Sequence, residues 1–436
     1  MNRRFRFKNR MTRDDLQRLS KEELVELVLQ LQRPDKTSRN SSKPPSTDRK
    51  ERRENAKPGG AKPGHQGHAR QLCENPDDFE DHAPTHCERC GLAFPEGAER
   101  ELIGEYDEIE LPPVKPFVVR HRRFAIRCSC CDKPTAAKVP AVAKGTPFGP
   151  RIHALAIYLK GMQLFSYERL RAAFRELFGL SISEGALMNI FKRKAPAFEA
   201  KRENALTSLR QARFVACDET GVRIEGVNAY HWVFCSEAAV VHGAEFTRSA
   251  EVVRETMDGH RPDVWTSDRY SAQQGHADRQ QTCLAHLARK VRFADENGQD
   301  DIPFRLRLWL GRAFDLAHEI TDIAASTLRA KRRKLERDHD AILNAPTACD
   351  RACELVGQFA RARDQLLTFC DFPGKVEPTD NVSERALRPC VIQRKVTNGY
   401  RAEWAAEHEA AVRTTVDTAR LAGAGPFQTI LQTVGA

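Results

Sequence analysis

The chain has 436 residues, enough for two or three domains, and its 40% hydrophobic and 30% charged residues fit a soluble globular protein. No run approaches the ~20 apolar residues of a membrane-spanning helix, and no apolar segment follows the basic N-terminus as it would in a secretion signal. This excludes a membrane protein and an exported one, so we expect a cytoplasmic location.

The net charge of +10 belongs to the first part of the chain. Residues 1–70 hold 19 Lys and Arg against 9 Asp and Glu, whereas the remaining residues hold 51 of each. A basic arm on a neutral body suits a polyanionic partner, because Lys and Arg neutralise phosphates and release counterions. A solvated tail that only aids solubility fits the charge about equally well.

Residues 1–72 are expected to form a basic N-terminal helical region and a flexible linker. Two capping-box patterns and a short apolar stripe predict one or two helices over 12–32. The stripe spans barely two heptads, so it fits a weak dimerisation helix and a helix docked on its own protein about equally well. Residues 33–67 are rich in proline, glycine, serine and charge, which indicates an extended or flexible segment.

The 13 cysteines do not indicate a disulfide scaffold, because their number is odd and the chain is large. Two Cys-x-x-Cys pairs can instead wrap a tetrahedral structural zinc ion, and we expect a zinc-binding domain over 73–145. The segment contains a β-like stretch over 117–126, and a β-hairpin could fill the gap between the pairs, as in a zinc ribbon. Reduced cysteines in a small core are the alternative. Four thiolates would close the coordination shell, which argues against a catalytic zinc. The predicted ligands are Cys87, Cys90, Cys128 and Cys131, with Cys73, His86 and Cys130 as possible substitutes.

Residues 146–204 are expected to be helical and to include a helix-turn-helix pattern. A helix over 168–178 ends near Gly179, and Ser183 can cap a second helix that runs to about Arg193. In a DNA-binding motif of this kind, the second helix enters the major groove. Helical hairpins are also common in structural bundles, so the pattern leaves DNA contact open.

After residue 205 the pattern changes to short strands. Four β-rich runs (RFVACDET, NAYHWVFC, AAVVHGAEF and DVWTSD) are broken by turn residues, and a fifth, QQTCLAH, leads into a helix. Residues 303–370 have an almost wholly helical composition. A helix is expected to begin near Asn381 and to be kinked or ended by Pro389, and another covers 404–421.

Two aspartates follow apolar runs and therefore lie at predicted strand ends. Asp218 follows FVAC and Asp268 follows VWTS. Carboxylates from neighbouring strand ends can converge, and a glutamate from a later helix can complete a site for Mg²⁺ or Mn²⁺. A pair of such ions can activate water or a 3′-hydroxyl and stabilise the leaving oxygen. On its own the pattern is weak, because aspartate at a strand end is often a turn former.

Several segments together resemble the transposases of the insertion-sequence sixty-six family. They cover nearly the whole chain: NSSKPPSTD, GGAKPGHQGH, the paired Cys-x-x-Cys motifs, DETGVRIEGVNAYHWVFC, WTSDRYSA, CLAHLARK and NVSERALRPCVIQRKVTNGYRAEWAAEHEAAVRTTVDTAR. The last is the most specific, because it is long and unusual in composition. The resemblance implies an α/β ribonuclease-H-like catalytic core with a helical insertion, preceded by a small Cys-rich zinc-binding domain and a helical DNA-binding region.

The resemblance also implies Asp-Asp-Glu chemistry. Carried onto matching positions, it makes Asp218, Asp268 and Glu384 the catalytic residues and the ligands of magnesium. The strand pattern by itself favours the two aspartates but does not distinguish Glu384 from other glutamates. The motif Cys283-x-x-His286 resembles one that follows the second aspartate in such transposases. We expect a structural role for the cysteine and a position near the active site for the histidine.

Basic side chains surround the predicted catalytic glutamate. Arg388 lies four residues after Glu384, so it shares a helix face with the glutamate and could hold a phosphate beside the metals. A solvated basic face is the alternative. The predicted DNA-binding residues are Arg385, Arg388, Arg394 and Lys395.

The sequence therefore predicts a DNA transposase that cuts strands at element ends and joins them to target DNA. The core is expected over 205–302, a helical insertion over 303–375, and the final catalytic helix with a tail over 376–436. Expected partners are the double-stranded DNA of the ends and the target, further copies of the chain, and accessory proteins of the element. The expected location is the nucleoid of a bacterial cytoplasm. The alternatives are a non-catalytic zinc-containing DNA-binding regulator, a ribonuclease-H-like nuclease without joining activity, and, disfavoured by the closed zinc ligands, a zinc-dependent hydrolase.

Overall fold

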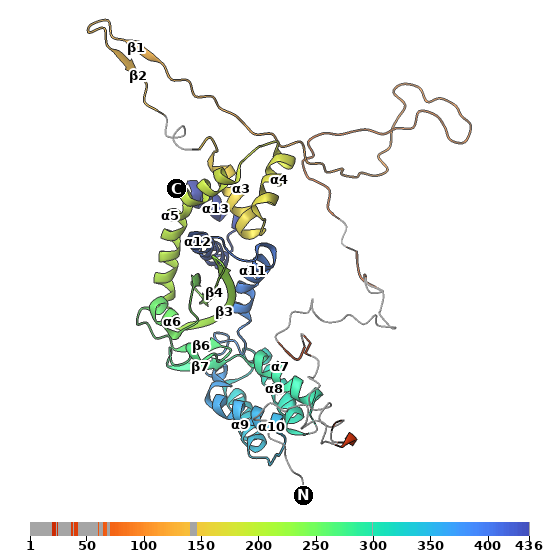
Figure 1. Ribbon diagram of the computed structural model, residues 1–436. Coiled ribbons are helices and arrows are strands. Elements are labelled where there is room, and N and C mark those ends of the chain that lie inside the picture. The colour runs from red at the N-terminus through yellow and green to blue at the C-terminus, as the bar shows by residue number, and fades with distance from the viewer. Residues whose placement is uncertain are drawn as a thin grey trace.

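The computed structural model describes residues 20–22, 24, 36, 37, 39–41, 60, 64–67, 70–139, 146–298 and 300–435. Residues 146–435 form a body of helices around one sheet, whereas residues 70–139 run away from that body (Figure 1). Most of the predicted N-terminal helix and linker lies outside the described residues. One turn of the linker is described. It is attached to α7 by a hydrogen bond in which the side-chain amide of Asn40 donates to Glu296 Oε2 at 2.8 Å.

The Cys-rich segment contains little regular structure. Its described strands are β1 (Ala125–Arg127) and β2 (Pro134–Ala136), which pair antiparallel. The β-like stretch predicted over 117–126 is therefore a strand only at its last two residues, so that prediction was largely wrong. A strand needs a hydrogen-bonded neighbour, and residues 117–123 have no pairing with β2.

Four helical elements follow: α3 (Pro150–Ile157), η3 (Tyr158–Met162), α4 (Tyr167–Phe178) and α5 (Glu184–Leu209). The predicted boundary between the last two is confirmed. Gly179 ends α4 at a φ of 60°, and the Ser183 hydroxyl caps α5 by accepting from Ala186 N at 3.2 Å. The second helix extends well past Arg193, however, because Phe198, Ala205 and Leu209 continue its buried face.

All five predicted strands form a single sheet in the order β5-β4-β3-β6-β7. The strands β3, β4 and β5 form an antiparallel meander, and β6 and β7 run parallel to β3. The helix α6 (Ala250–Met257) connects the two parts. The bounds are β3 (Phe214–Ile224), β4 (Val227–Cys235), β5 (Val240–Glu245), β6 (Val264–Ser267) and β7 (Arg279–Thr282).

The two faces of the sheet are covered by different helices, as the alternation of side chains along β4 shows. Trp232 and Phe234 pack in a cluster with residues of α5 and α6. Val233 and Cys235 pack instead with Leu387 of α11 (Asn381–Thr397). The sheet therefore separates the helices that precede β6 from the helix that carries the predicted glutamate.

The predicted helical stretch 303–370 is confirmed and packs at one end of the body, away from α3 and α4 (Figure 1). Trp309, Leu335 and Phe359 contribute to a hydrophobic cluster that continues to Val264 of β6. The helix α7 (Leu284–Glu296) precedes this stretch. The elements that form the stretch are α8 (Ile302–Glu319), α9 (Ala325–Leu343), α10 (Asp350–Ala362), η5 (Arg363–Gln365) and η6 (Thr368–Asp371).

We predicted that Pro389 would kink or end the helix. It does not end it, because α11 continues through Pro389 to Thr397. Proline removes the hydrogen bond to the carbonyl oxygen four residues earlier, which here belongs to the exposed Arg385 and can be hydrated. The chain then turns at Gly399, with a φ of 111°, where a Cβ atom would lie 2.2 Å from the Arg223 carbonyl oxygen. Only glycine allows this approach, which lets Tyr400 N donate to the same oxygen at 2.7 Å.

The last helices are α12 (Glu403–Leu421), close to the predicted 404–421, and α13 (Pro426–Gly435). The first of them packs along β5 and α5, and the second packs against α3. Across the described part of the chain, no helix combines the length and apolar character that crossing a membrane requires.

Candidate active site

The register of the sheet brings the two predicted aspartates together. In the parallel pairing of β3 with β6, Ala216 is opposite Thr266. Asp218 and Asp268 each follow two residues later, at the point where the paired region ends. Side chains two residues apart share a face, so Asp218 lies on the face of Ala216, which α11 covers.

Asp218 is held in a crowded acidic environment. One carboxylate oxygen accepts from Glu219 N at 2.8 Å. Burial raises the pKa of Asp218 to about 7, and the charges of Glu219, Asp268 and Glu384 act in the same direction. This mutual repulsion indicates that the three predicted catalytic carboxylates face a common region.

Asp268 follows the last residue of β6 and begins a tight turn. Its Oδ1 accepts from Tyr270 N at 2.8 Å, and the intervening Arg269 adopts a left-handed φ of 71°. A left-handed non-glycine residue is uncommon and costs conformational energy, so the turn is a specific feature of this site. It orients the Asp268 side chain beside the end of β3.

Glu384 lies in the first turn of α11. Its Oε1 is 3.3 Å from Arg289 Nη2 and 3.6 Å from His286 Nε2, both of α7. The leucine one turn later, Leu387, anchors the helix on the sheet. The glutamate therefore lies where α11 meets α7, near enough to Asp218 for the two charges to interact.

The three carboxylates offer only oxygen ligands, which suits Mg²⁺ or Mn²⁺. Their ligand oxygens do not all lie within 4.8 Å of one another in the described residues. The contact of Glu384 with Arg289 holds the glutamate in its present position. The donor set fits a divalent cation.

A fourth acid, Asp380, belongs to the same region but escaped the sequence analysis. It is fully buried at the start of α11, and burial together with the charge of Asp218 raises its pKa well above the usual range. The Asp380 backbone N–H donates to Cys283 Sγ at 3.2 Å. Its position four residues before Glu384 could have indicated that it lies near the predicted site. An aspartate before a helix, however, is usually interpreted only as a helix cap.

The two residues of the Cys283-x-x-His286 motif lie beside the predicted carboxylates. Cys283 is buried, and its N–H donates to Ser267 O at 2.8 Å, next to Asp268. Its sulfur accepts from Asp380, so it links the end of β6 to the start of α11. His286 contacts Glu384, and burial beside Arg289 lowers its pKa.

A second group of interacting side chains, which the sequence did not predict, lies next to Asp218. Glu219 is buried and accepts from Arg248 Nε at 2.6 Å, and also from Gln273. The Arg248 guanidinium lies 3.8 Å from the centre of the Tyr270 ring. The network therefore ties the strand that carries Asp218 to the turn that follows Asp268, and no local pattern signals a contact between residues so far apart in sequence.

The basic residues predicted to contact DNA are not equivalent. Arg385, Arg388 and Lys395 are exposed along α11. Arg394 is half-buried, and its guanidinium donates to the Gly221 carbonyl oxygen of β3. That contact gives Arg394 a structural role in holding α11 against the sheet.

The cysteine pairs form the local turns that a zinc site uses. Gly91 N donates to Cys87 O at 2.8 Å, and Asp132 N donates to Cys128 O at 2.9 Å. Backbone N–H groups within each turn lower the pKa of the Cys87 and Cys128 thiols, which favours the thiolates that zinc binds. Each turn fits two zinc ligands, although the sulfurs of the two turns do not lie within 4.8 Å of one another in the described residues.

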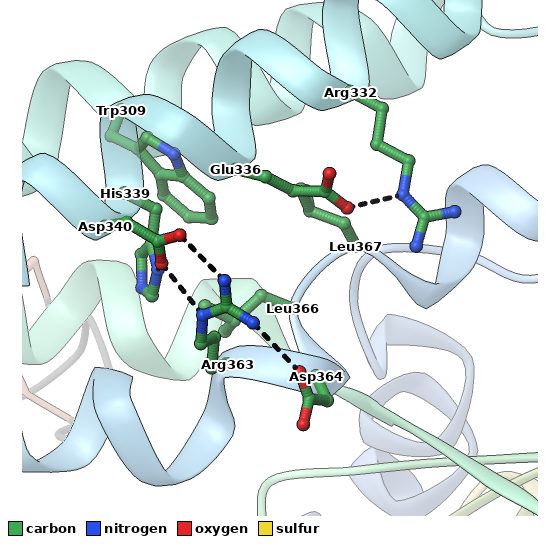
Figure 2. A pocket seen from close by; sticks show the side chains of 9 residues that line it. All are labelled: Trp309, Arg332, Glu336, His339, Asp340, Arg363, Asp364, Leu366 and Leu367. Atoms are coloured by element: carbon green, nitrogen blue, oxygen red, sulfur yellow. Dashed lines mark hydrogen bonds and ion pairs between the residues drawn. The ribbon is translucent and has the colours of Figure 1, made fainter.

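A hollow elsewhere in the body is not part of this site. It lies within the helical stretch, lined by Trp309, Arg332, Glu336, His339, Asp340, Arg363, Asp364, Leu366 and Leu367 (Figure 2). The Arg363 Nη2 atom is 2.7 Å from Asp340 Oδ2 across its mouth. Its charged groups are thus paired with one another, and it contains none of the three predicted catalytic carboxylates.

Two segments of the chain match known protein families. Residues 145–408 match the model of the transposase IS66 family, and residues 84–132 match that of the zinc-finger binding domain of the IS66 transposase. No curated protein matches the chain. The first match covers more than half of the chain and includes all three predicted carboxylates, and the second includes the four predicted zinc-ligating cysteines. The chain belongs to the IS66 family of transposases, with a zinc-finger domain ahead of its transposase domain.

Proposed function

We propose that this transposase is an Asp-Asp-Glu enzyme that cuts DNA at the ends of its element and joins the exposed 3′-hydroxyls to target DNA. The observation that carries the proposal is the meeting of Asp218 and Asp268 at adjacent strand ends, opposite Glu384 of α11. The substrate would be double-stranded DNA with inverted repeats at the element ends.

The catalytic core would be ribonuclease-H-like. Support comes from the mixed five-stranded sheet, in which an antiparallel meander comes first and two parallel strands follow beside its first strand. In this proposal the core spans 205–302 and 376–436, and the helices within 303–375 are an insertion that delays the final catalytic helix.

Asp218, Asp268 and Glu384 would hold the divalent ions. When bound, Mg²⁺ or Mn²⁺ would activate the attacking oxygen and stabilise the leaving one. Asp218 has to ionise for this, and its high pKa means that ion binding releases a proton near neutral pH. Arg289 would hold Glu384 before the ions bind and could then turn toward a DNA phosphate.

DNA would run along the exposed side of α11. Arg388 follows Glu384 by one helical turn, and Arg385 and Lys395 are exposed on the same helix. Phosphate contacts from these side chains would position a strand at the carboxylates without reading its sequence. Arg394 contributes less to this interface in the proposal, because its guanidinium is already bonded to β3.

The zinc-finger domain would bind zinc through Cys87, Cys90, Cys128 and Cys131 as a structural ion. Zinc would close the two turns into one unit and position residues 73–145 for DNA ahead of the core. Assembly of two element ends would involve more than one copy of the chain and, where the element encodes them, accessory proteins.

The test is a cleavage and strand-transfer assay on DNA that carries the element ends. Alanine variants of Asp218, Asp268 and Glu384 are expected to lose both activities, by at least about 1000-fold, while binding to end DNA persists. Asp263→Ala is the matched control, because this exposed aspartate pairs with Arg213 away from the carboxylates.

The same assay separates the alternatives. Binding to end DNA without Mg²⁺-dependent cleavage by the parent chain would favour a non-catalytic regulator. Cleavage without joined products would favour a nuclease. Strand transfer at the parent rate by any of the three alanine variants would overturn the assignment of that carboxylate.

A further inference from the structure

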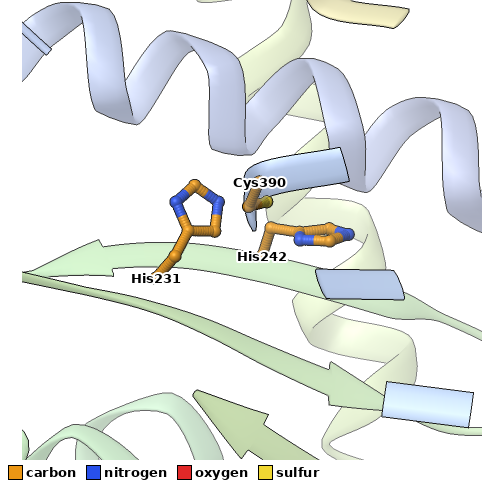
Figure 3. A group of neighbouring side chains, drawn as sticks. All are labelled: His231, His242 and Cys390. Carbon is orange, nitrogen blue, oxygen red and sulfur yellow. The ribbon is translucent and has the colours of Figure 1, made fainter. Parts of the chain in front are cut away.

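Three potential metal ligands meet on the α11 side of the sheet, apart from the carboxylates. His231 of β4, His242 of β5 and Cys390 of α11 each offer one ligand atom, and these atoms all lie within 4.8 Å of one another. Figure 3 shows the two imidazoles rising from neighbouring strands toward the helix that carries the cysteine. Both histidines are inaccessible to solvent and Cys390 is 5% exposed.

The histidines are incompletely satisfied in this environment. Among the residues that the structure describes, neither ring nitrogen of His231 has a hydrogen-bond partner, and His242 Nδ1 has none either. Buried polar atoms without partners are rare because they lose their hydration without compensation. A neutral imidazole can present a lone pair on one ring nitrogen to a metal ion.

The remaining nitrogen of His242 is bonded in the way that metal-ligating histidines usually are. His242 Nε2 lies 3.0 Å from Asp417 Oδ2 of α12. A carboxylate that accepts from one ring nitrogen fixes the tautomer and leaves the other nitrogen free to bind a metal. Here the free atom is Nδ1, the one without a partner.

We propose that His231, His242 and Cys390 form a structural site for a transition-metal ion, with zinc as the best candidate. Two imidazole nitrogens and one thiolate suit zinc, whereas Mg²⁺ and Ca²⁺ prefer oxygen ligands. With three protein ligands, the fourth position of a tetrahedral ion falls to a water molecule.

The surrounding charges balance such an ion. The thiolate of Cys390 and the carboxylate of Asp417 are the two anionic groups at the ion, and Asp417 is also paired with the half-exposed Arg420 at 2.8 Å. The other buried charges nearby, Arg413 and Glu409, form their own pair at 2.6 Å. Binding would release the thiol proton of Cys390 to solvent and would leave no net charge buried.

The site would fasten the catalytic helix to the sheet. Cys390 lies six residues after Glu384 on α11, and the two histidines come from adjacent strands. The inference concerns metal content and does not depend on the Asp-Asp-Glu proposal. Zinc content that survives in the Asp218→Ala variant separates a failure of one proposal from a failure of the other.

The experiment measures zinc by elemental analysis in the purified full chain. The parent is expected to hold about two zinc ions, with one in the zinc-finger domain and one at the new site. Cys390→Ser and His242→Gln should each hold about one. Cys370→Ser is the matched control, a cysteine buried to the same degree in η6, and should keep both ions.

Cobalt substitution supplies a second readout. In a full chain whose four zinc-finger cysteines are changed to serine, Co²⁺ should give a thiolate charge-transfer band that the added Cys390→Ser change removes. A variant is interpreted only if its far-ultraviolet circular dichroism matches that of the parent. If either Cys390→Ser or His242→Gln misfolds, the metal content of the other variant tests the proposal. Only about one zinc ion in the parent, or a cobalt band that survives Cys390→Ser, would overturn the proposal.

Discussion

The Cys-rich segment and the sheet region differ in how many of their side chains are buried. Between residues 70 and 139 nearly every residue is exposed, and the described strands there are three residues long. The sheet region instead buries large side chains on both faces, among them Trp232, Trp265 and Leu387. We therefore expect a bound metal to stabilise the first region, which contains the zinc-finger domain, whereas burial of apolar surface stabilises the second.

The largest expected effect comes from opening the core. Trp265 of β6 is fully buried on the face of the sheet that α5 and α6 cover, so Trp265→Ala should destabilise the protein by about 3–5 kcal/mol. The matched change in the Cys-rich segment is Phe117→Ala, at a side chain 93% exposed, and should cost less than about 0.5 kcal/mol. Denaturant unfolding followed by tryptophan fluorescence measures both. Equal losses would break the comparison.

A smaller effect is expected from removing one partner of a buried ion pair. Arg248→Ala leaves the buried carboxylate of Glu219 without its main partner, and should cost about 1–3 kcal/mol. The control is Arg100→Ala, whose pair with Asp81 is exposed on both sides and should contribute less than about 1 kcal/mol. Urea unfolding measures the free energy of unfolding of both variants. If neither substitution changed it, the contact between Arg248 and Glu219 would not contribute to stability.

Loss of zinc from the finger should leave the core unchanged. The double variant Cys87→Ser with Cys128→Ser is expected to lose about one zinc ion and to expose residues 84–132 to protease. The main unfolding transition should move by less than about 0.5 kcal/mol, because the described residues of this segment are mostly exposed. Limited proteolysis and denaturant unfolding test this, and a large shift would show that the two regions are coupled.

The last expected effect is a pH dependence that arises in the sheet region. The pKa of Asp218 is raised from its usual value of 3.8 to about 7, so the folded state holds a proton that the unfolded state has lost. The associated stability is fully present below pH 4 and declines as pH rises from about 4 to 7 in the metal-free protein. Asp218→Asn should flatten this decline. A parent chain whose stability rises over this range relative to the variant would contradict the shifted pKa.

The elements that could be predicted are those set by local pattern. The five strands and the Ser183 cap follow from apolar runs and turn residues that are neighbours in sequence. The continuation of α11 through Pro389 and of α5 to Leu209 depends on packing that one segment does not reveal.

The site divides in the same way. Asp218 and Asp268 follow apolar runs, so strand periodicity alone pointed to them. Glu384 required the family resemblance, since nothing local marks it among the glutamates. Arg289 and Asp380 escaped notice because their roles arise where α7, β6 and α11 meet, which is a property of tertiary structure.

The central claim is that the carboxylates bind the ions that carry out strand transfer, and replacement of one oxygen ligand by sulfur tests it most directly. Asp268→Cys should be inactive in joining assays with Mg²⁺, because a thiolate is a poor ligand for this hard cation. Activity should return in part with Mn²⁺, which accepts softer ligands. Parent-level joining by Asp268→Cys in Mg²⁺ would contradict the account.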